Sequence, residues 1–329
     1  MIDLKSELVA STPPAYGVSK RRQWLIGLFV VFLFFIFVSY YLSAHWGEFC
    51  YLWEFSYRET LMAGVLLFLG FLLTCYQMNL FLKKFGVRAG FFELIFVTHG
   101  MMLGNLVIPM RGGSGGLAVY LKKKHRLNYH KFGVIFGGTA ILVGLVSATM
   151  SLGALFFLAI AHSIFELSLT AISLVLLAGC LYLTFFPPRF KRYGSGRMMA
   201  FASRLNESWV SISKDVALLT RVTISLLFIN LFQTSALYLL YIAVGSPLSF
   251  LGTLITSSLG AVANLVPITP GSLGIFDAVA IQAPRLLGLD TTAAIMATVL
   301  LRILCFVICF VVGMPGLYYF YRAARSENP

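Results

Sequence analysis

The sequence predicts an all-α polytopic membrane protein, with about six full spans and two re-entrant broken-helix hairpins in an inverted repeat. Of its 329 residues, 59% are hydrophobic and only 11% are charged, whereas soluble domains carry roughly 25% charged residues. The apolar runs are continuous and long enough for helical spans, while a membrane β-barrel would alternate polar and apolar residues. A short motif that breaks an apolar run also occurs twice, once in each half of the chain.

Six apolar runs are expected to cross the membrane as helices. A basic segment, residues 20–22, precedes the first run, which is longer than the apolar core of a signal peptide. The expected spans are residues 24–44, 61–82, 132–161, 167–186, 222–244 and 292–321. They would form one transmembrane domain, residues 23–321, between two cytoplasmic tails, residues 1–22 and 322–329.

The first motif begins at Asn105 and combines a proline, an arginine and a glycine-rich run. Proline lacks a backbone donor, and glycine costs about 1 kcal/mol relative to alanine inside a helix. With four glycines in residues 112–116, we expect the backbone there to be irregular rather than helical. The candidate site residues in this motif are Asn105, Pro109, Arg111, Gly112, Gly113, Ser114 and Gly115.

The second motif lies far downstream and shares Asn-Leu-Val, a proline, Gly-Ser and a further glycine with the first. Its candidate site residues are Asn264, Pro267, Thr269, Pro270, Gly271, Ser272 and Gly274. Gly-rich segments in membrane helices often serve only for close helix packing. The repetition of the whole pattern favours a shared functional design instead.

Charge distribution predicts how the two motifs meet the membrane. Lys and Arg are enriched in cytoplasmic loops, and a basic cluster at residues 122–126 follows the first motif. A re-entrant hairpin over about residues 91–121 keeps that cluster inside, and the same count makes residues 250–287 a hairpin from the opposite side. Residues 198–219 have the spacing of an amphipathic helix at the cytoplasmic interface. Inverted repeats with broken helices at the midplane are typical of alternating-access transporters.

Backbone groups left unpaired at membrane depth cost several kcal/mol each, so two broken helices imply a polar cavity. Successive amides at residues 112–116 could form an anion nest, and the Arg111 guanidinium suits phosphate. Arg302, within the last span, is a second candidate cation. Asp277 is the acid closest to the second motif and could pair with either arginine.

Other functional classes find less support in the sequence. The net charge of +13 arises from basic residues at span ends, so we expect contact with membrane lipids and no nucleic acid. No metal-ligand cluster or nucleotide motif occurs, so no metal or cofactor is expected. The run around Ser114 fits G-x-S-x-G, but a serine nucleophile needs a base. His99 is the one histidine deep enough, and it is expected to serve in helix packing.

At these motifs the chain resembles the transmembrane flippase domain family of lysylphosphatidylglycerol synthases. The matching residues are Asn105, Pro109, Arg111, Gly113, Asn264, Pro267, Pro270, Gly271, Gly274 and Asp277. The sequence departs from the family pattern at Ser114-Gly115, where an acid often follows the glycine, and at Asp277, where glutamate is usual. The resemblance implies a stand-alone member without the soluble aminoacyl-transferase domain, so we expect no enzyme activity.

We therefore expect a lipid flippase of the cytoplasmic (inner) membrane, with both termini inside. Its substrate would be an anionic phospholipid or a polyprenyl-phosphate-linked sugar, moved through a polar cavity at the midplane. A second hypothesis is a non-transporting membrane subunit that binds a glycosyltransferase or lipid-modifying enzyme through residues 187–219. A third is an intramembrane serine protease with Ser114 as nucleophile.

Overall fold

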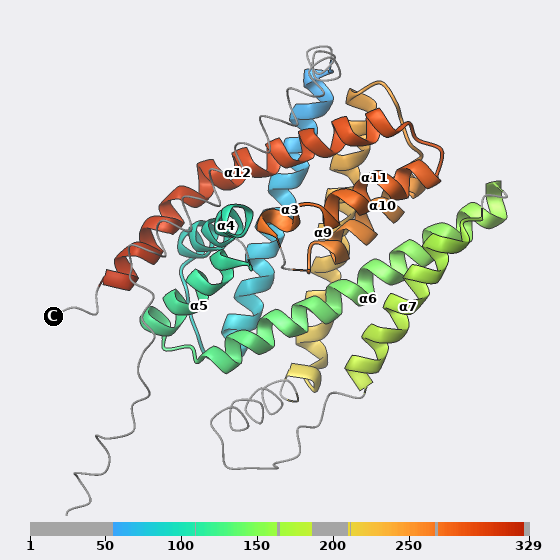
Figure 1. Ribbon diagram of the computed structural model, residues 1–329. Helices are drawn as coiled ribbons and strands as arrows, with labels where there is room; N and C mark the ends of the chain where they lie inside the picture. The colour runs from blue at the N-terminus through green and yellow to red at the C-terminus, as the bar shows by residue number, and fades with distance from the viewer. Residues whose placement is uncertain are drawn as a thin grey trace, which may run out of the picture. The chain divides into compact units, whose positions relative to one another are not determined.

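In the computed structural model, residues 55–108, 110–162, 165–185, 210, 212–266 and 269–325 are described, and no β-strand occurs among them. These residues belong to one compact unit, residues 50–329. In chain order its elements are α3 (Tyr57–Lys84), α4 (Phe91–Val107), α5 (Gly112–His125), α6 (Tyr129–His162), α7 (Leu167–Phe185), α9 (Val216–Ala243), α10 (Phe250–Ala263), the 3-10 turn η2 (Pro270–Ser272), α11 (Ile275–Leu286) and α12 (Thr291–Arg325) (Figure 1).

Within the described part of the chain, five helices are long and apolar enough to cross a membrane: α3, α6, α7, α9 and α12. They coincide with five of the six predicted spans, and the other, residues 24–44, lies outside the described residues. Large apolar side chains remain exposed on these helices, such as Val175 on α7 and Val311 on α12. Such surfaces are stable against lipid tails rather than water. The protein is a polytopic all-α membrane protein, as predicted.

The two halves of the chain repeat the same elements with a constant spacing. Helices α3 and α9 both have 28 residues, and both of their ends are 159 residues apart (57 to 216 and 84 to 243). The same spacing relates Asn105 to Asn264 in the two motifs. It also relates Gly86 to Gly245, which follow α3 and α9 with positive φ angles of 79° and 75°. The repeat therefore includes the helices and the turns, beyond the motifs alone.

The two repeats are inverted relative to each other. The Ser56 amide at the start of α3 donates to the Ala243 carbonyl at the end of α9, at 3.2 Å. At the opposite ends, Lys84 Nζ lies 2.6 Å from Asp215 Oδ2. Because α3 starts where α9 ends, the helices are antiparallel, as Figure 1 shows. The inverted repeat predicted from the motifs is confirmed for this pair.

Packing between the repeats exchanges their elements. Helix α4 of the first repeat packs extensively on α12 of the second, and α10 of the second packs on α6 of the first. The α4–α12 contact brings backbone against backbone: a Cβ at Gly316 would collide with the Phe96 carbonyl, and a Cβ at Gly313 would lie 2.7 Å from the carbonyl carbon of His99. Small residues permit such contacts between membrane helices. Each broken helix is thus fixed by the opposite repeat.

The start of α9 differs from the sequence-based boundary. Most of the predicted amphipathic helix, residues 198–219, lies outside the described residues, but its last four positions belong to α9. Asp215 ends the preceding turn because its carboxylate accepts a hydrogen bond from the Leu218 amide at 3.0 Å, as a helix N-cap does. Hydrogen bonds from Lys84 and from the Leu218 amide hold the pKa of Asp215 below its ordinary value.

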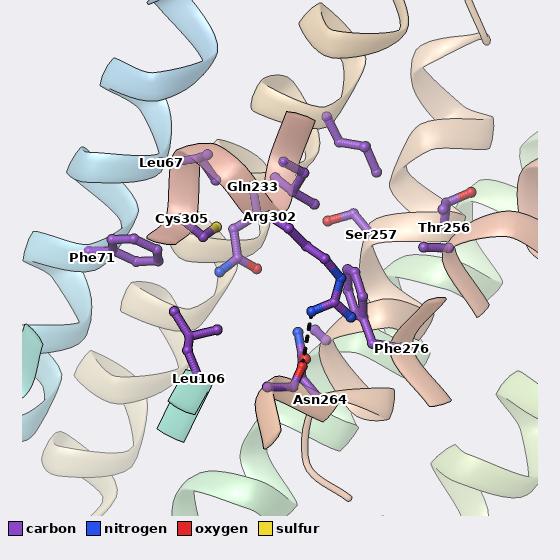
Figure 2. A pocket seen from close by; sticks show the side chains of 15 residues that line it. Leu67, Phe71, Leu106, Gln233, Thr256, Ser257, Asn264, Phe276, Arg302 and Cys305 are labelled. Atoms are coloured by element: carbon purple, nitrogen blue, oxygen red, sulfur yellow. Dashed lines mark hydrogen bonds between the residues drawn. The ribbon is translucent and has the colours of Figure 1, made fainter. Parts of the chain in front are cut away.

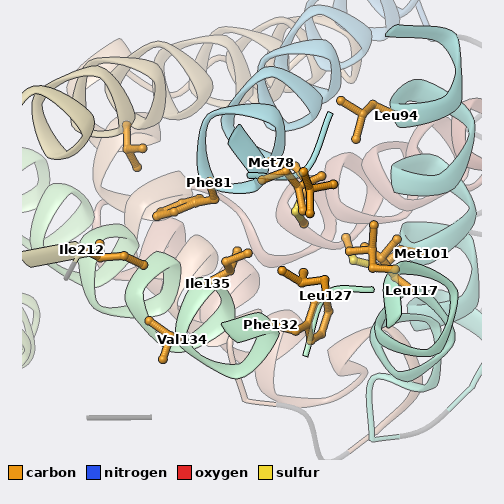
Figure 3. Close-up of a cluster of buried hydrophobic side chains, with 14 of the residues drawn as sticks. Met78, Phe81, Leu94, Met101, Leu117, Leu127, Phe132, Val134, Ile135 and Ile212 are labelled. Carbon is orange, nitrogen blue, oxygen red and sulfur yellow. The ribbon is translucent and has the colours of Figure 1, made fainter. Parts of the chain in front are cut away.

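A hydrophobic cluster fixes the first hairpin, α4–α5, to the neighbouring helices (Figure 3). It joins residues from α3, α4, α5, α6 and α9, and among its members are Met78, Phe81, Leu94, Met101, Leu117, Phe132, Ile135 and Val222. Side chains of this size each contribute roughly 1.5–3 kcal/mol when buried from water, and close packing replaces that driving force inside a membrane. The hairpin is therefore built into the core of its own repeat.

Candidate functional site

The first motif forms the tip of an antiparallel helical hairpin, α4–α5. At the tip, the Ser114 amide donates to Asn105 Oδ1 at 2.9 Å. At the base, Glu93 of α4 accepts hydrogen bonds from Tyr120 and His125 of α5, at 2.8 and 2.6 Å. The two helices therefore lie side by side along their length.

The chain breaks before the glycine run rather than within it, so the expectation of an irregular backbone at residues 112–116 is wrong. Met110 and Arg111 adopt left-handed φ angles of 54° and 55°, and α5 begins at Gly112. Tertiary packing overrides the low helix propensity of glycine, because a Cβ at Gly113 would collide with the Met101 carbonyl of α4. The glycines let α5 approach α4 backbone to backbone.

This geometry reduces the predicted anion nest. The Ser114 amide is used by Asn105 and by the Arg111 carbonyl, and the Gly115 amide donates to the same carbonyl at 3.3 Å. Among the described residues, only the amides of Gly112 and Gly113 at the start of α5 lack such a partner. These two amides lie at the positive end of the helix dipole, where anions are favoured.

The second motif forms the corresponding tip between α10 and α11. Its backbone turns through left-handed φ angles at Gly271 (56°) and Ser272 (53°). The Ser272 hydroxyl donates to the carbonyls of Asn264 and Val266 at 3.3 and 3.4 Å. Thr269 Oγ1 donates to the Leu273 carbonyl at 2.6 Å. The hydroxyls of this motif therefore hold the loop in shape.

The two tips meet, although they are 159 residues apart. Arg111 Nη2 donates to the Asn264 carbonyl at 2.6 Å, and the Arg111 guanidinium lies 5.6 Å from the centre of the Phe136 ring. A Cβ at Gly271 would lie 3.3 Å from Leu106 Cδ2, so the second tip also packs directly on the first. The structure thus brings the two predicted motifs into one place.

Arg302 of α12 forms an ion pair with Asp277 of α11. Its Nε donates to Asp277 Oδ1 at 2.7 Å, and Nη1 donates to the Gly271 carbonyl at 3.2 Å. Nη2 lies 2.6 Å from the same carboxylate oxygen but has no well-oriented acceptor. Asp277 Oδ2 accepts from the Gly274 amide at 2.9 Å, which caps α11. Asp277 therefore pairs with Arg302, and not with Arg111.

A cavity of about 120 Å³ adjoins this ion pair and reaches the second tip (Figure 2). Its walls come from α3, α9, α10, α11 and α12, and Leu106 contributes from the first motif. The polar residues that line it are Gln233, Thr256, Ser257, Asn264 and Arg302. The apolar lining includes Leu67, Phe71, Leu237 and Phe276. A polar site enclosed by apolar walls lies between the two broken hairpins.

Sequence reasoning missed Gln233, Thr256 and Ser257. Gln233 is a polar residue within an apolar span, and Thr256 and Ser257 belong to a run of three hydroxyl residues in α10. An intramembrane polar residue is a signal that could have identified them. Their convergence on one cavity depends on the packing of α9 against α10, which a single sequence does not reveal.

The predicted site residues fall into three groups. Asn264, Gly271 and Arg302 line the cavity, and Asp277 pairs with one of them. The residues that shape the two tips are Asn105, Arg111, Gly112, Gly113, Ser114, Thr269, Ser272 and Gly274. Gly115 is exposed with open space around its Cα, and Pro109 and Pro267 lie outside the described residues, as does the side chain of Pro270.

Ser114 and His99 occupy separate environments in the described structure. The Ser114 hydroxyl lies 3.2 Å from Asn105 Oδ1, to which it donates. His99 Nδ1 donates to the Ile95 carbonyl at 2.8 Å, and its ring packs against Phe71 in an edge-on contact. Each side chain thus has a local structural partner. This arrangement gives the protease hypothesis no nucleophile–base pair among the described residues.

Comparison with known protein families matches residues 24–313 to the family described as the lysylphosphatidylglycerol synthase TM region. The match includes both hairpins, the cavity and all five of the long apolar helices as far as residue 313. A search of curated proteins finds no match to the chain.

Proposed function

The chain belongs to the lysylphosphatidylglycerol synthase transmembrane family, and on this premise we propose that it is a lipid flippase of the cytoplasmic (inner) membrane. It moves an anionic phospholipid or a polyprenyl-phosphate-linked sugar from one leaflet to the other. The headgroup passes through the cavity between the hairpins while the tails stay in the bilayer. Both termini lie in the cytoplasm.

One observation carries this proposal: two broken hairpins meet beside a cavity that contains an intramembrane arginine. A charge at membrane depth is costly, so arginine there is retained for a function or for an ion pair. Arg302 has an ion pair, yet its Nη2 lacks a well-oriented acceptor. A guanidinium with a donor to spare suits a phosphate oxygen, which accepts charge-assisted hydrogen bonds.

The hairpins supply the route by which a headgroup reaches this arginine. Helix α4 has 17 residues and is about 26 Å long at 1.5 Å per residue, less than the ~30 Å hydrocarbon core. We therefore assign α4–α5 and α10–α11 as re-entrant elements that approach the midplane from opposite faces. Each face then has its own opening toward one shared cavity, which is what alternating access requires.

Arg111 serves as the second cation on this route. It is bonded to the Asn264 carbonyl, whose residue lines the cavity. A carbonyl satisfies a hydrogen bond without cancelling the positive charge, so Arg111 can still attract an anion. The free amides of Gly112 and Gly113 lie next to it in the chain and point the same helix dipole toward the anion.

Translocation of acyl-labelled phospholipids in reconstituted vesicles tests the proposal. We expect Arg302→Ala and Arg111→Ala each to slow translocation by about tenfold or more, the value of one charge-assisted hydrogen bond. Arg285→Ala is the matched control, because Arg285 lies on α11 in the same hairpin but is exposed and does not line the cavity. Unchanged rates in both Arg302→Ala and Arg111→Ala would reject the site.

The same preparation separates a flippase from a membrane subunit of a glycosyltransferase or lipid-modifying enzyme. A flippase translocates lipid as a purified single protein. If translocation occurs only after co-expression with such an enzyme, the subunit hypothesis replaces the flippase.

A further inference from the structure

The polar residues in the cavity differ in how their hydrogen bonds are satisfied. The Thr256 hydroxyl donates to the Gly252 carbonyl at 3.0 Å. In contrast, the side chains of Gln233 on α9 and Ser257 on α10 form no hydrogen bond with any described residue. The Asn264 side-chain amide, at the second tip, also forms none. All four residues line the same cavity beside Arg302.

Polar groups that are partly buried and unpaired are costly, so water or a ligand must satisfy them. A side-chain amide offers donors and an acceptor, and a hydroxyl can donate and accept. Gln233, Ser257 and Asn264 therefore suit a ligand whose groups also both donate and accept. Hydroxyl groups have this property, whereas phosphate oxygens only accept and an ammonium group only donates.

The charges around the cavity exclude an amine-bearing headgroup. Arg302 is the charged residue in the described lining, and the nearest carboxylate, Asp277, is already paired with it. An ammonium group in this space would approach a guanidinium without a free carboxylate to neutralise it. Like charges in a medium of low dielectric constant repel strongly, so zwitterionic headgroups are disfavoured.

The volume of the cavity sets the size of the headgroup. An apolar cavity of about 150 Å³ can hold benzene, which has six heavy atoms. The cavity of about 120 Å³ therefore holds a fragment of that order, such as glycerol, and lies below the ~300 Å³ of ordinary ligand pockets. A larger sugar would require the walls to separate.

Building on the proposed flippase function, we infer that the cavity selects anionic lipids whose headgroup carries a small polyol of about the size of glycerol. Arg302 contacts the phosphate, and Gln233, Ser257 and Asn264 bind the hydroxyl groups. Gln233 and Ser257 are the residues that determine specificity, because neither has another partner among the described residues.

Four acyl-labelled lipids test this inference with the full-length protein in vesicles. Phosphatidylglycerol should be translocated about two- to tenfold faster than phosphatidic acid, which lacks the polyol, since one or more hydrogen bonds are lost. Phosphatidylethanolamine should be slower still because of its ammonium group, and phosphatidylinositol should be slowed by its size. Equal rates for all four would overturn the inference but leave the flippase function intact. No translocation of any of them would reject the flippase function itself.

Variants assign the selectivity to individual side chains. Gln233→Leu and Ser257→Ala should slow phosphatidylglycerol about two- to tenfold and leave phosphatidic acid unchanged. Gln233→Glu adds a carboxylate and should raise the rate of phosphatidylethanolamine relative to phosphatidylglycerol. Thr149→Val is the control, since this exposed hydroxyl on α6 bonds only to the Leu145 carbonyl of its own helix. If both Gln233→Glu and Ser257→Ala fold but keep the wild-type lipid preference, the assignment is wrong.

Discussion

Arg111 and Arg302 are the intramembrane cations of the two hairpin regions, and their surroundings differ. Arg302 has a carboxylate partner, Asp277, and the side chains are 24% and 26% exposed. Arg111 bonds to a neutral backbone carbonyl and lies near an aromatic ring. The repeat spacing of 159 residues places Pro270 opposite Arg111, so the positive charge in the first hairpin has no counterpart in the second. The charges therefore break the symmetry that the helices keep.

The bases of the hairpins differ in a similar way. In the first, Glu93 contacts Lys124 and His125 at 3.2 and 2.6 Å. The same spacing replaces Glu93 by Gly252 and Lys124 by Ala283, and the second base packs through an apolar cluster instead. One hairpin is held at its base by ions and the other by apolar contacts. In a carrier that opens alternately to two faces, this difference gives the two openings unequal stability.

The largest expected effect concerns the glycine contact that closes the first tip. The spacing places Ser272 opposite Gly113, so the second tip accommodates a side chain where the first cannot. Gly113→Ala should lower the free energy of unfolding by about 3 kcal/mol, because its Cβ would collide with the Met101 carbonyl. Thermal unfolding in detergent measures the loss.

Two other substitutions serve as references for that loss. Gly115→Ala should be neutral or stabilising by up to about 1 kcal/mol, since a Cβ there meets open space in a helix. Ser272→Ala should cost about 1 kcal/mol through its lost hydrogen bonds. Equal stability of the Gly113→Ala and Gly115→Ala proteins would contradict the backbone contact between α4 and α5.

An intermediate effect is expected from breaking the ion pair of the second hairpin. Asp277→Asn should destabilise the protein by about 2 kcal/mol, because Arg302 is left without its counter-charge. Arg111→Gln should cost less stability, about 1 kcal/mol, since it removes a hydrogen bond to a neutral carbonyl. The comparison is made by chemical unfolding of both proteins.

A double-mutant cycle with Asp277→Asn and Arg302→Gln sharpens this prediction. The double variant should lose less stability than the two single losses combined, as contacting charges require. Strictly additive losses would show that the two side chains do not interact.

The smallest effect is expected at the base of the first hairpin. Glu93→Gln keeps the size of the side chain but removes its charge toward Lys124 and His125. The loss of stability should be about 1 kcal/mol, because Lys124 is 46% exposed and water screens its contribution. Hydrogen–deuterium exchange should detect faster exchange at the start of α4 than at the start of α10. Matching exchange at both bases in wild type and variant would remove the proposed difference between them.

The sequence by itself determined the membrane class, five of the described helices and the paired motifs. These features are local: a span is a continuous apolar run, and a motif is a set of neighbours in the chain. The inversion of the repeats also followed from sequence, because basic residues at the ends of spans report which side each end occupies. The structure confirmed it through the contacts at both ends of α3 and α9.

Only the tertiary structure decided how the glycine run folds and which residues form the cavity. Residues 112–116 are helical because α4 lies against them and Asn105 caps their first turn, and no local preference encodes that contact. Likewise, Asp277 had two arginines available, and the packing of α11 on α12 chose Arg302. Gln233 and Ser257 became neighbours through the packing of α9 on α10. Contacts between distant segments depend on how whole helices pack, and a linear pattern of residues does not contain that information.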